Sequence, residues 1–132
     1  MHTFTLSLHS ALESERIDDV ERFVGEDTSG SFGVLARHER FLTVLVFGLA
    51  RYRCRGQPWQ YLALPGALAY FVDNELFIST RRYLRDVDYN RISLALTEQL
   101  LKEEEVLHAL KLNLRRLEEA MLKQLLDIER GR

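Results

Sequence analysis

The sequence predicts an α+β protein in which an N-terminal antiparallel β-sandwich is followed by a C-terminal α-helical hairpin or extended helix. Two observations predict this division. Both prolines and six of the seven glycines lie before residue 87, where short apolar runs alternate with turn residues. Residues 87–130 contain neither proline nor glycine, and apolar residues recur there every three or four positions. We therefore place a β-sandwich domain at 1–86 and a helical domain at 87–132.

The first part of the chain reads as a series of short strands. Phe4–His9 alternates apolar and polar residues, as in a half-buried strand, and Val20–Val24 is a second strand before a turn at Gly25–Gly30. Phe41–Phe47 is apolar on both sides of the pleat, which predicts a strand inside the sandwich. Further strands are predicted, with turns between them, at Ala50–Arg55, Trp59–Leu64, Ala67–Val72 and Glu75–Ser79. Strands that recur about every 8 to 12 residues indicate a sandwich or barrel.

The second part carries one apolar stripe of helical period. At about 1.5 Å per residue, residues 87–130 would form a single helix about 66 Å long. The charged run Lys102–Glu105 is the one candidate hinge, and it holds no helix breaker. Both a hairpin and a single rod are therefore compatible with the sequence. The stripe consists of Tyr89, Ile92, Leu96, Leu100, Leu107, Leu110, Leu114, Leu117, Met121, Leu125 and Ile128.

The composition is that of an ordinary globular chain. Of 132 residues, 46% are hydrophobic and 29% are charged, and the net charge of -2 favours no strongly charged partner. Cys54 is the only cysteine, so the chain can form no internal disulfide, and its first residues do not resemble a signal peptide. The longest apolar stretch, Phe41–Ala50, is about half the roughly 20 residues that a membrane helix needs. We expect no direct membrane insertion.

Motifs of catalysis or metal binding are not found in the sequence. The four histidines and Cys54 lack metal-ligand spacing, and there is neither a nucleophile elbow nor a phosphate loop. His38 fits a loop histidine that bonds the backbone next to a core strand; a small enzyme centred on it is the alternative. Arg51, Arg53 and Arg55 fit a solvated strand face. A free-standing nucleic-acid-binding module that uses this arginine row is the runner-up function.

One segment resembles a known family. Residues 29–48, SGSFGVLARHERFLTVLVFG, are similar to a segment of F-type ATP synthase epsilon subunits that reads roughly G-x-[LF]-G-[IV]-x-x-x-H-x-x-[LF]-[LI]-T-x-[LI]-x-x-G. The matching positions are Gly30, Phe32, Gly33, Val34, His38, Phe41, Leu42, Thr43, Leu45 and Gly48. A second segment, YLALPGALAYFVDNELFIST, resembles that family at Leu62, Gly66, Leu68, Phe71, Asn74, Leu76 and Ile78. The resemblance covers the whole chain, because the family also has a strand-rich domain followed by two helices.

The resemblance implies a non-catalytic subunit of the rotor's central stalk. In that family the sandwich grips the gamma subunit and rests on the ring of c subunits. The C-terminal helices fold down as a hairpin or extend along gamma towards the catalytic head, where the beta subunits lie, and the extended form obstructs ATP hydrolysis. We therefore expect a peripheral protein on the cytoplasmic face of the bacterial inner membrane. The expected interface with gamma and the c ring consists of Gly30, Ser31, Phe32, Gly33, His38, Phe41 and Leu42.

The chain departs from the family pattern at several positions. Ser31 stands where an acidic residue is common, and Ala36-Arg37 and Glu39-Arg40 flank His38 in place of Pro-Gly and Ala-Pro. Some epsilon subunits bind ATP through [IL]-D-x-x-R-A; this chain keeps Asp88 and Arg91 but has Ile92 in place of alanine.

Asp88 equally suits the start of a helix. We expect no cofactor, with ATP as a regulatory ligand at Asp88 and Arg91 the alternative. The departures indicate a divergent branch, such as the alternate, sodium-translocating F-type ATPases; the coupling ion itself is chosen in the c ring.

Overall fold

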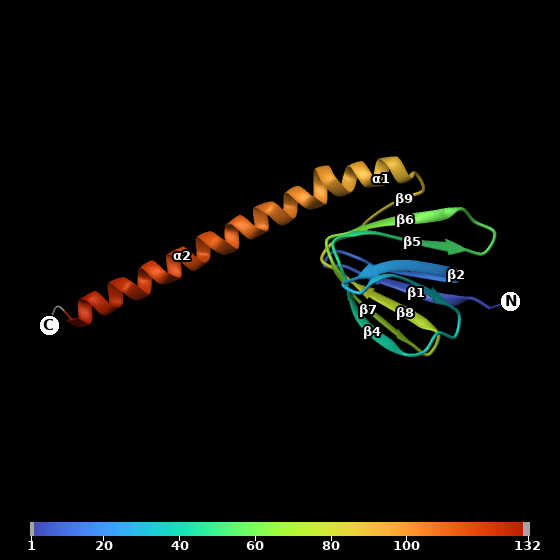
Figure 1. Cartoon of the computed structure of the whole chain (residues 1–132), viewed down its shortest axis with the longest axis horizontal. Coiled ribbons are helices and arrows are strands. Elements are labelled where there is room, and N and C mark those ends of the chain that lie inside the picture. The colour runs from blue at the N-terminus through green and yellow to red at the C-terminus, as the bar shows by residue number, and fades with distance from the viewer. Residues whose placement is uncertain (1, 131–132) are drawn as a thin grey trace. The chain divides into compact units, whose positions relative to one another are not determined.

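The computed structural model describes residues 2–130 and contains nine strands followed by helix (Figure 1). The chain forms two compact units, the first ending at Leu100 and the second beginning at Leu101. The elements are β1 (Phe4–His9), β2 (Ser14–Asp27), β3 (Gly30–Leu35), β4 (Phe41–Leu45), β5 (Gly48–Cys54), β6 (Trp59–Leu64), β7 (Ala67–Val72), β8 (Glu75–Ser79), β9 (Leu84–Asp86), α1 (Tyr89–Ala95), η1 (Leu96–Leu101) and α2 (Lys102–Arg130).

The strands form the predicted β-sandwich. Their hydrogen-bonded order is β1-β8-β7-β4-β2-β5-β6-β9, with β3 also paired to β2. The long strand β2 belongs to both layers, because its first half pairs with β1 and its second half pairs with β3 and β5. One layer is therefore β3-β2-β5-β6-β9, and the other is β4-β7-β8-β1 with the start of β2.

The core lies between these layers and follows from the alternation of each strand. Phe4, Leu6 and Leu8 of β1 point inward and are at most 2% exposed. Gly25 lies within β2 because the core leaves no room for a side chain there: a Cβ would lie 2.9 Å from Phe23 and 3.2 Å from Leu45. The other buried members of this core are Val20, Phe23, Val34, Leu45, Ala50, Tyr52, Leu62, Leu64, Ala67, Ala69, Phe71, Leu76, Ile78 and Tyr83.

Several predicted boundaries were wrong. The predicted turn at Gly25–Gly30 is mostly strand, since β2 continues to Asp27 and β3 begins at Gly30. Gly25 is required by packing and not by a turn. Arg55 was predicted to end a strand but lies in the turn after β5, which ends at Cys54. Strands β3 and β9 were not predicted, because β3 is rich in small residues and β9 has only three residues.

The predicted hairpin between β7 and β8 is present and also organises a neighbouring loop. Asp73 and Asn74 have φ of 50° and 58°, the left-handed values that a tight two-residue hairpin turn needs. The Asn74 side chain accepts a hydrogen bond from the Arg37 N–H at 2.7 Å and donates one to the Thr3 carbonyl at 2.9 Å. The turn thereby holds the backbone immediately before His38.

The helical residues of the first unit pack on the sandwich. α1 begins after Asp88 and is followed by the π-helical segment η1. Ile92 and Leu100 are buried with Ala63 of β6, and Leu96 packs beside them. Successive members of this set of helix residues are four positions apart. In an ordinary α-helix, residues at this spacing shift progressively around the axis and do not stay on one face. The wider turn of η1 keeps them on one face.

The second unit is one helix. α2 contains the charged segment Lys102–Glu105 without a turn, so of the two predicted alternatives, a hairpin and an extended helix, the structure has the extended helix. Lysine and glutamate are good helix formers, which explains why a run of charges does not end the helix. No α2 side chain is buried, and Leu110, Leu114 and Leu117 are 52%, 60% and 58% exposed.

Candidate functional site

The turn between β2 and β3 is held by a single carboxylate. Asp27 accepts hydrogen bonds from the backbone N–H and the hydroxyl of Ser29, and from Thr43 Oγ1 of β4 at 2.8 Å. These bonds, the Ser29 hydroxyl first, hold the pKa of Asp27 below its ordinary value of 3.8. Gly30 follows with φ of 122°, a conformation that favours glycine. The turn is therefore fixed to β4 and presents Ser31 to solvent.

A hollow of about 340 Å³ opens beside this turn. Five of the seven predicted interface residues line it together with Asp27 and Thr43: Phe32, Gly33, His38, Phe41 and Leu42. The structure thus brings most of the predicted site together. The other two, Gly30 and Ser31, lie at the adjacent turn.

His38 is an exposed loop residue packed on aromatic rings. Its Nδ1 lies 2.7 Å from the carbonyl oxygen of Glu39, so Nδ1 carries the proton and donates it. Its ring meets Phe41 and Phe71 edge to face, with centroids 5.0 Å and 5.8 Å apart. Phe41 and Phe71 face each other across the β4–β7 pair. The imidazole therefore positions the loop against the end of the core.

An exposed apolar surface continues from this hollow along the outer side of β4, β7 and β8. Leu42 and Val44 are each 64% exposed, and their cross-strand partners Tyr70 and Leu68 lie on the same face. Tyr70 in turn stacks on Phe77 of β8 at 6.2 Å. We call Leu42, Val44, Leu68, Tyr70 and Phe77 the apolar face.

Four of these five residues were missed as interface residues. The signal was present in the sequence, because the run Phe41–Phe47 is apolar on both sides of the pleat. We predicted that both sides are buried, and this was wrong for the outer side. An apolar run on a strand whose outer side has no covering layer marks a surface for another protein.

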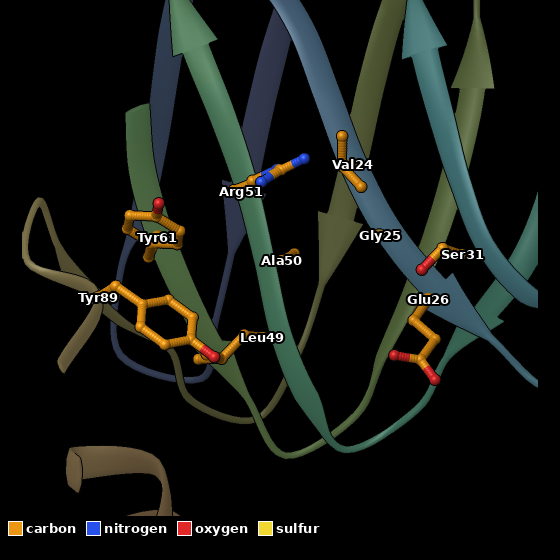
Figure 2. A pocket seen from close by; sticks show the side chains of 9 residues that line it. All are labelled: Val24, Gly25, Glu26, Ser31, Leu49, Ala50, Arg51, Tyr61 and Tyr89. Atoms are coloured by element: carbon orange, nitrogen blue, oxygen red, sulfur yellow. The ribbon is translucent and has the colours of Figure 1, made fainter. Parts of the chain in front are cut away.

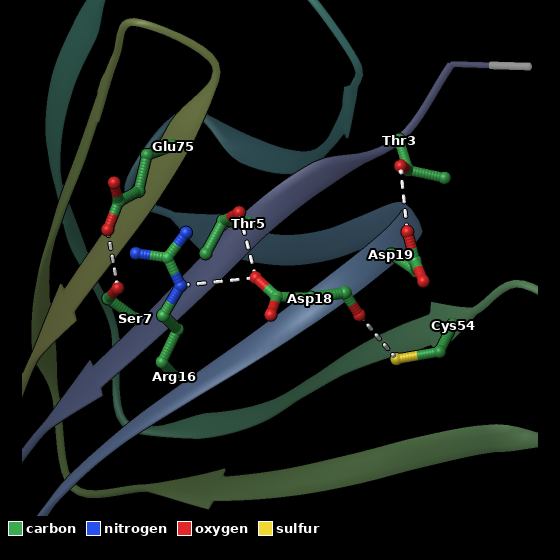
Figure 3. Close-up of polar contacts among 8 residues, drawn as sticks. All are labelled: Thr3, Thr5, Ser7, Arg16, Asp18, Asp19, Cys54 and Glu75. Carbon is green, nitrogen blue, oxygen red and sulfur yellow. Dashed lines mark hydrogen bonds and ion pairs between the residues drawn. The ribbon is translucent and has the colours of Figure 1, made fainter.

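The apolar face is bordered by polar and charged groups. The Arg40 guanidinium lies over the Tyr70 ring at 5.6 Å. At the edge of this layer away from β4, β1 and the start of β2 direct hydrogen-bonded polar side chains outward (Figure 3). The Ser7 hydroxyl donates to Glu75 at 2.6 Å, and Asp18 is bonded by Thr5 and Arg16. An apolar centre with a polar rim is the anatomy of a protein–protein interface.

The opposite layer has a different outer face. Arg51 and Arg53 of β5 point outward beside Tyr61 and Trp59 of β6, and Arg22 of β2 lies directly opposite Arg53. We call Arg22, Arg51, Arg53, Trp59 and Tyr61 the arginine face. Next to it is a hollow of about 250 Å³ with Tyr61 and Tyr89 on one side and Glu26 with Ser31 on the other (Figure 2). The two tyrosine rings meet edge to face at 5.5 Å.

The two residues predicted for ATP already serve the start of α1. Asp88 is the N-cap and accepts a hydrogen bond from the Arg91 N–H at 3.1 Å, which confirms its helix-starting role. The Arg91 guanidinium lies 2.9 Å from Asp86. The Asp88 N–H and then Arg91 hold the pKa of Asp86 below its ordinary value. Both side chains therefore make contacts within the chain.

A half-buried network joins the two layers at one end of the sandwich. The Tyr83 hydroxyl donates to Glu15 at 2.9 Å, and the Arg85 guanidinium pairs with the same carboxylate at 2.8 Å. Arg85 also donates to the Tyr52 hydroxyl at 3.1 Å. Burial and the bond to Glu15 raise the pKa of Tyr83 far above its ordinary value. The network anchors β9, the strand that leads into α1.

Neither a metal-binding cluster nor a membrane-spanning helix is found among the described residues. Within residues 2–130, no three His, Cys, Asp or Glu side chains gather closely enough to hold a metal ion. None of the helices that the structure describes is long and apolar enough to cross a membrane.

Known proteins similar to this chain point to one family. The family described as ATP synthase, Delta/Epsilon chain, beta-sandwich domain matches residues 3–86. ATP synthase epsilon chain 2 of Cereibacter sphaeroides is 30% identical over 96 residues, which are 72% of this chain and 64% of that protein. ATP synthase epsilon chain of Synechocystis sp. is 34% identical over 59 residues, 45% of this chain and 43% of that protein. The chain thus spans less than two thirds of the length of these two relatives.

Solved structures share the fold at low identity. One chain of the Euglena gracilis mitochondrial ATP synthase structure, OSCP/F1/c-ring, superposes with a TM-score of 0.60 at 22% identity, covering 74% of this chain and 64% of that chain. One chain of the Tetrahymena thermophila mitochondrial ATP synthase central stalk/c-ring structure gives 0.54 at 14% identity, covering 64% and 69%. These matches give no support to the nucleic-acid-binding alternative. Carrying its β-sandwich domain at residues 3–86, the chain belongs to the ATP synthase Delta/Epsilon chain family.

Proposed function

We propose that this chain is a non-catalytic epsilon subunit in the central stalk of a rotary ATP synthase. The sandwich binds the gamma subunit through the apolar face and the hollow at His38, and the β2–β3 turn meets the c ring. In that role the chain couples gamma to the c ring during ion-driven ATP synthesis or ATP-driven ion transport. The complex lies in the bacterial inner membrane, and the chain is bound peripherally on its cytoplasmic face.

The exposed aliphatic residues of the apolar face carry this proposal. Leu42, Val44 and Leu68 are 64%, 64% and 45% exposed and adjoin one another on two paired strands. Water is an unfavourable environment for such a cluster, and a partner that covers it gains about 25 cal/mol for each Å² of apolar area buried. Membership of the family supports the gamma subunit as that partner.

A charge placed in the apolar face tests the proposal. We expect Leu42→Glu and Val44→Glu each to weaken binding of the gamma subunit at least about tenfold, since a buried unpaired charge costs about 1.4 kcal/mol or more. Binding is measured by titration calorimetry with the full chain. Leu35→Glu is the matched control, because Leu35 is 58% exposed but lies on β3, beside Arg22.

Two results would contradict the proposal: gamma binding unaffected by Leu42→Glu, or equal loss with Leu35→Glu. The thermal unfolding midpoints of all three variants should match that of the unaltered chain. This comparison separates a lost contact from a lost fold.

The β2–β3 turn supports the proposed contact with the c ring. Asp27 fixes the turn to β4, so the exposed Ser31 is presented on a rigid support. Ser31→Trp should hinder assembly of the chain with the c ring while leaving gamma binding within about twofold. Copurification of both partners with the tagged chain measures the two effects separately.

The exposed stripe of α2 supports a regulatory role for the helix. A helix with no buried side chain and a row of exposed leucines is suited to bind a second surface. We propose that α2 contacts the catalytic head at the beta subunits and inhibits ATP hydrolysis. A chain ending at Leu101 keeps Ile92 and Leu100 on Ala63 and should raise the hydrolysis rate of the assembled complex. An unchanged rate would contradict inhibition.

We propose that the chain acts without a bound nucleotide. Asp88 caps α1 and Arg91 pairs with Asp86, so ATP would have to break contacts that start the helix. Millimolar ATP with Mg²⁺ should leave the thermal unfolding midpoint of the chain unchanged, and a saturable rise would contradict this. Assignment to a sodium-translocating branch stays a prediction, which the sequence of the companion c subunit would test.

A further inference from the structure

The arginine face carries more positive charge than its surroundings balance. Arg22 and Arg53 are directly opposite each other on β2 and β5, and like charges in such a pair are destabilising. Glu21 lies 3.6 Å from Arg53 and pairs with it. Within the part of the chain that the structure describes, Arg22 and Arg51 have no carboxylate partner. Two guanidinium groups are thus available to an anionic ligand.

The arginines are also placed for directional binding. The Arg51 guanidinium lies over the Trp59 ring, 4.7 Å from its centroid. Stacking on an indole holds the guanidinium plane while its N–H groups stay free at the edge. Those edges match the two oxygens of a carboxylate. The Trp59 contact therefore orders the Arg51 guanidinium before a carboxylate binds, so binding loses little further side-chain entropy.

Two hollows lie beside Arg22 and Arg51, and each has aliphatic and aromatic side chains within a lining that is otherwise polar. One, of about 250 Å³, is lined by Glu21, Arg22, Leu35, Arg53 and Trp59. The other lies on the side of Arg51, where Val24, Leu49 and Tyr61 contribute to its wall. A ligand that fits both arginines and both hollows has acidic groups with apolar groups between them.

We propose that the arginine face binds an acidic polypeptide segment of a partner, in which aliphatic residues separate glutamates or aspartates. The carboxylates pair with Arg22 and Arg51, and the aliphatic side chains enter the hollows beside Leu35 and Val24. Glu21 and Glu26 border the face and repel any anion close to them, so carboxylates spaced apart by aliphatic residues fit better than the continuous run of phosphates in a nucleic acid. This surface is separate from the apolar face, so it provides for a second partner.

The single tryptophan of the chain makes the proposal directly measurable. Trp59 lies on the arginine face in contact with Arg51, so its fluorescence reports a ligand that binds there. The probe is the blocked peptide Glu-Leu-Glu-Glu-Leu-Glu, titrated into the full chain at low salt. We expect a saturable change in emission, with an affinity that falls as the ionic strength rises. The same peptide with glutamine at each glutamate should bind at least tenfold more weakly.

Some substitutions should weaken peptide binding and one should strengthen it, and together they test the individual residues. Arg22→Gln and Arg51→Gln should each weaken peptide binding about tenfold, judged by the titration midpoint because Arg51→Gln also alters the starting emission. Glu21→Gln should strengthen binding, since it releases Arg53. A gain in affinity cannot arise from misfolding. Arg16→Gln, in the other layer and paired with Asp18, is the matched control and should change nothing.

Several outcomes would overturn the proposal. These are no saturable change in emission, equal binding of the glutamine peptide, or weaker binding by Glu21→Gln. Tighter binding of a single-stranded oligonucleotide or of inorganic phosphate would identify a phosphate site instead. A change in peptide-free emission on replacing Glu118 and Glu119 with glutamine would show that the chain's own helix, and not a partner, occupies the face.

Discussion

Strand alternation produces both outer faces of the sandwich, but the outward apolar residues of the two faces differ in whether the chain covers them. On the β5–β6 side, the outward Ala63 is fully buried because Ile92 and Leu100 cover it. On the β4–β7 side, the outward Leu42 and Val44 stay exposed. The chain covers one apolar surface with its own helix and leaves the other open. The open surface is therefore the one that implies a missing partner.

The first test of this comparison shortens one inward and one outward side chain of the β4–β7 strand pair. Phe71→Ala removes a ring that is 1% exposed, packed on Phe41 and Phe4, and should destabilise the fold by about 3 to 5 kcal/mol. Leu42→Ala, on the outer side of the same pair, should change stability by less than about 0.5 kcal/mol. Urea unfolding followed by circular dichroism measures both. Similar losses in the two variants would mean that the outer side is covered within the chain.

The second test concerns the helical cover on the other face. Leu100→Ala should cost about 2 to 4 kcal/mol, because the side chain is 0% exposed and packs over Ala63. Leu110→Ala, in α2 and 52% exposed, is the matched control with an expected change below about 0.5 kcal/mol. Unfolding of the full chain monitored by Trp59 emission compares them. Equal effects would place the division between the two units later in the chain than Leu100.

The third test addresses the network that joins the two layers. Tyr83→Phe removes the hydroxyl that donates to Glu15, and we expect a loss of about 1 kcal/mol because the acceptor is charged and half-buried. Tyr70→Phe is the control: the Tyr70 hydroxyl has no hydrogen-bond partner among the described residues. Its unfolding free energy should stay within about 0.5 kcal/mol of the unaltered value. A neutral Tyr83→Phe would show that Arg85 alone satisfies Glu15.

Much of the fold was predictable because strand alternation and helical period are local properties. The strand Phe4–His9 and the hairpin at Asp73–Asn74 were predicted correctly from neighbouring residues alone. Strand β3 was not, because its small residues depend on pairing with β2 for their conformation. The π-helical segment at Leu96–Leu101 was also not predicted, because hydrophobic periodicity does not distinguish it from an α-helix. It accompanies the packing of Ile92, Leu96 and Leu100 on Ala63, a contact between residues far apart in the sequence.

The candidate site was predictable in part. His38, Phe41 and Leu42 were found by resemblance, and they do lie together at one hollow. Leu68, Tyr70 and Phe77 complete the apolar face only through the pairing of β4 with β7 and of β7 with β8. The register between distant strands decides which residues share a face, and a single sequence does not specify that register. Asp27 was missed for the same reason, since Thr43 reaches it across strands.

The smallest expected effect concerns Asp27, whose carboxylate attaches the β2–β3 turn to the edge of the apolar face. Hydrogen bonds from Ser29 and Thr43 lower its pKa in the folded chain, so the ionised form favours folding. That contribution is complete above the ordinary value of 3.8 and is lost as the pH falls through the lower folded pKa. Carboxyl-carbon NMR across an acid titration should therefore give a pKa below 3.8 for Asp27.

Thr43→Val sharpens this test because it removes one donor and keeps the carboxylate. Ser29 still donates in that variant, so the Asp27 pKa should move towards 3.8 without reaching it. Asp27→Asn removes the charge, and the variant should lose less stability on acidification than the unaltered chain. A Thr43→Val titration identical to that of the unaltered chain would mean that the turn is held by Ser29 alone. The β2–β3 turn would then be free to move independently of Leu42, and the hollow would not be a rigid extension of the apolar face.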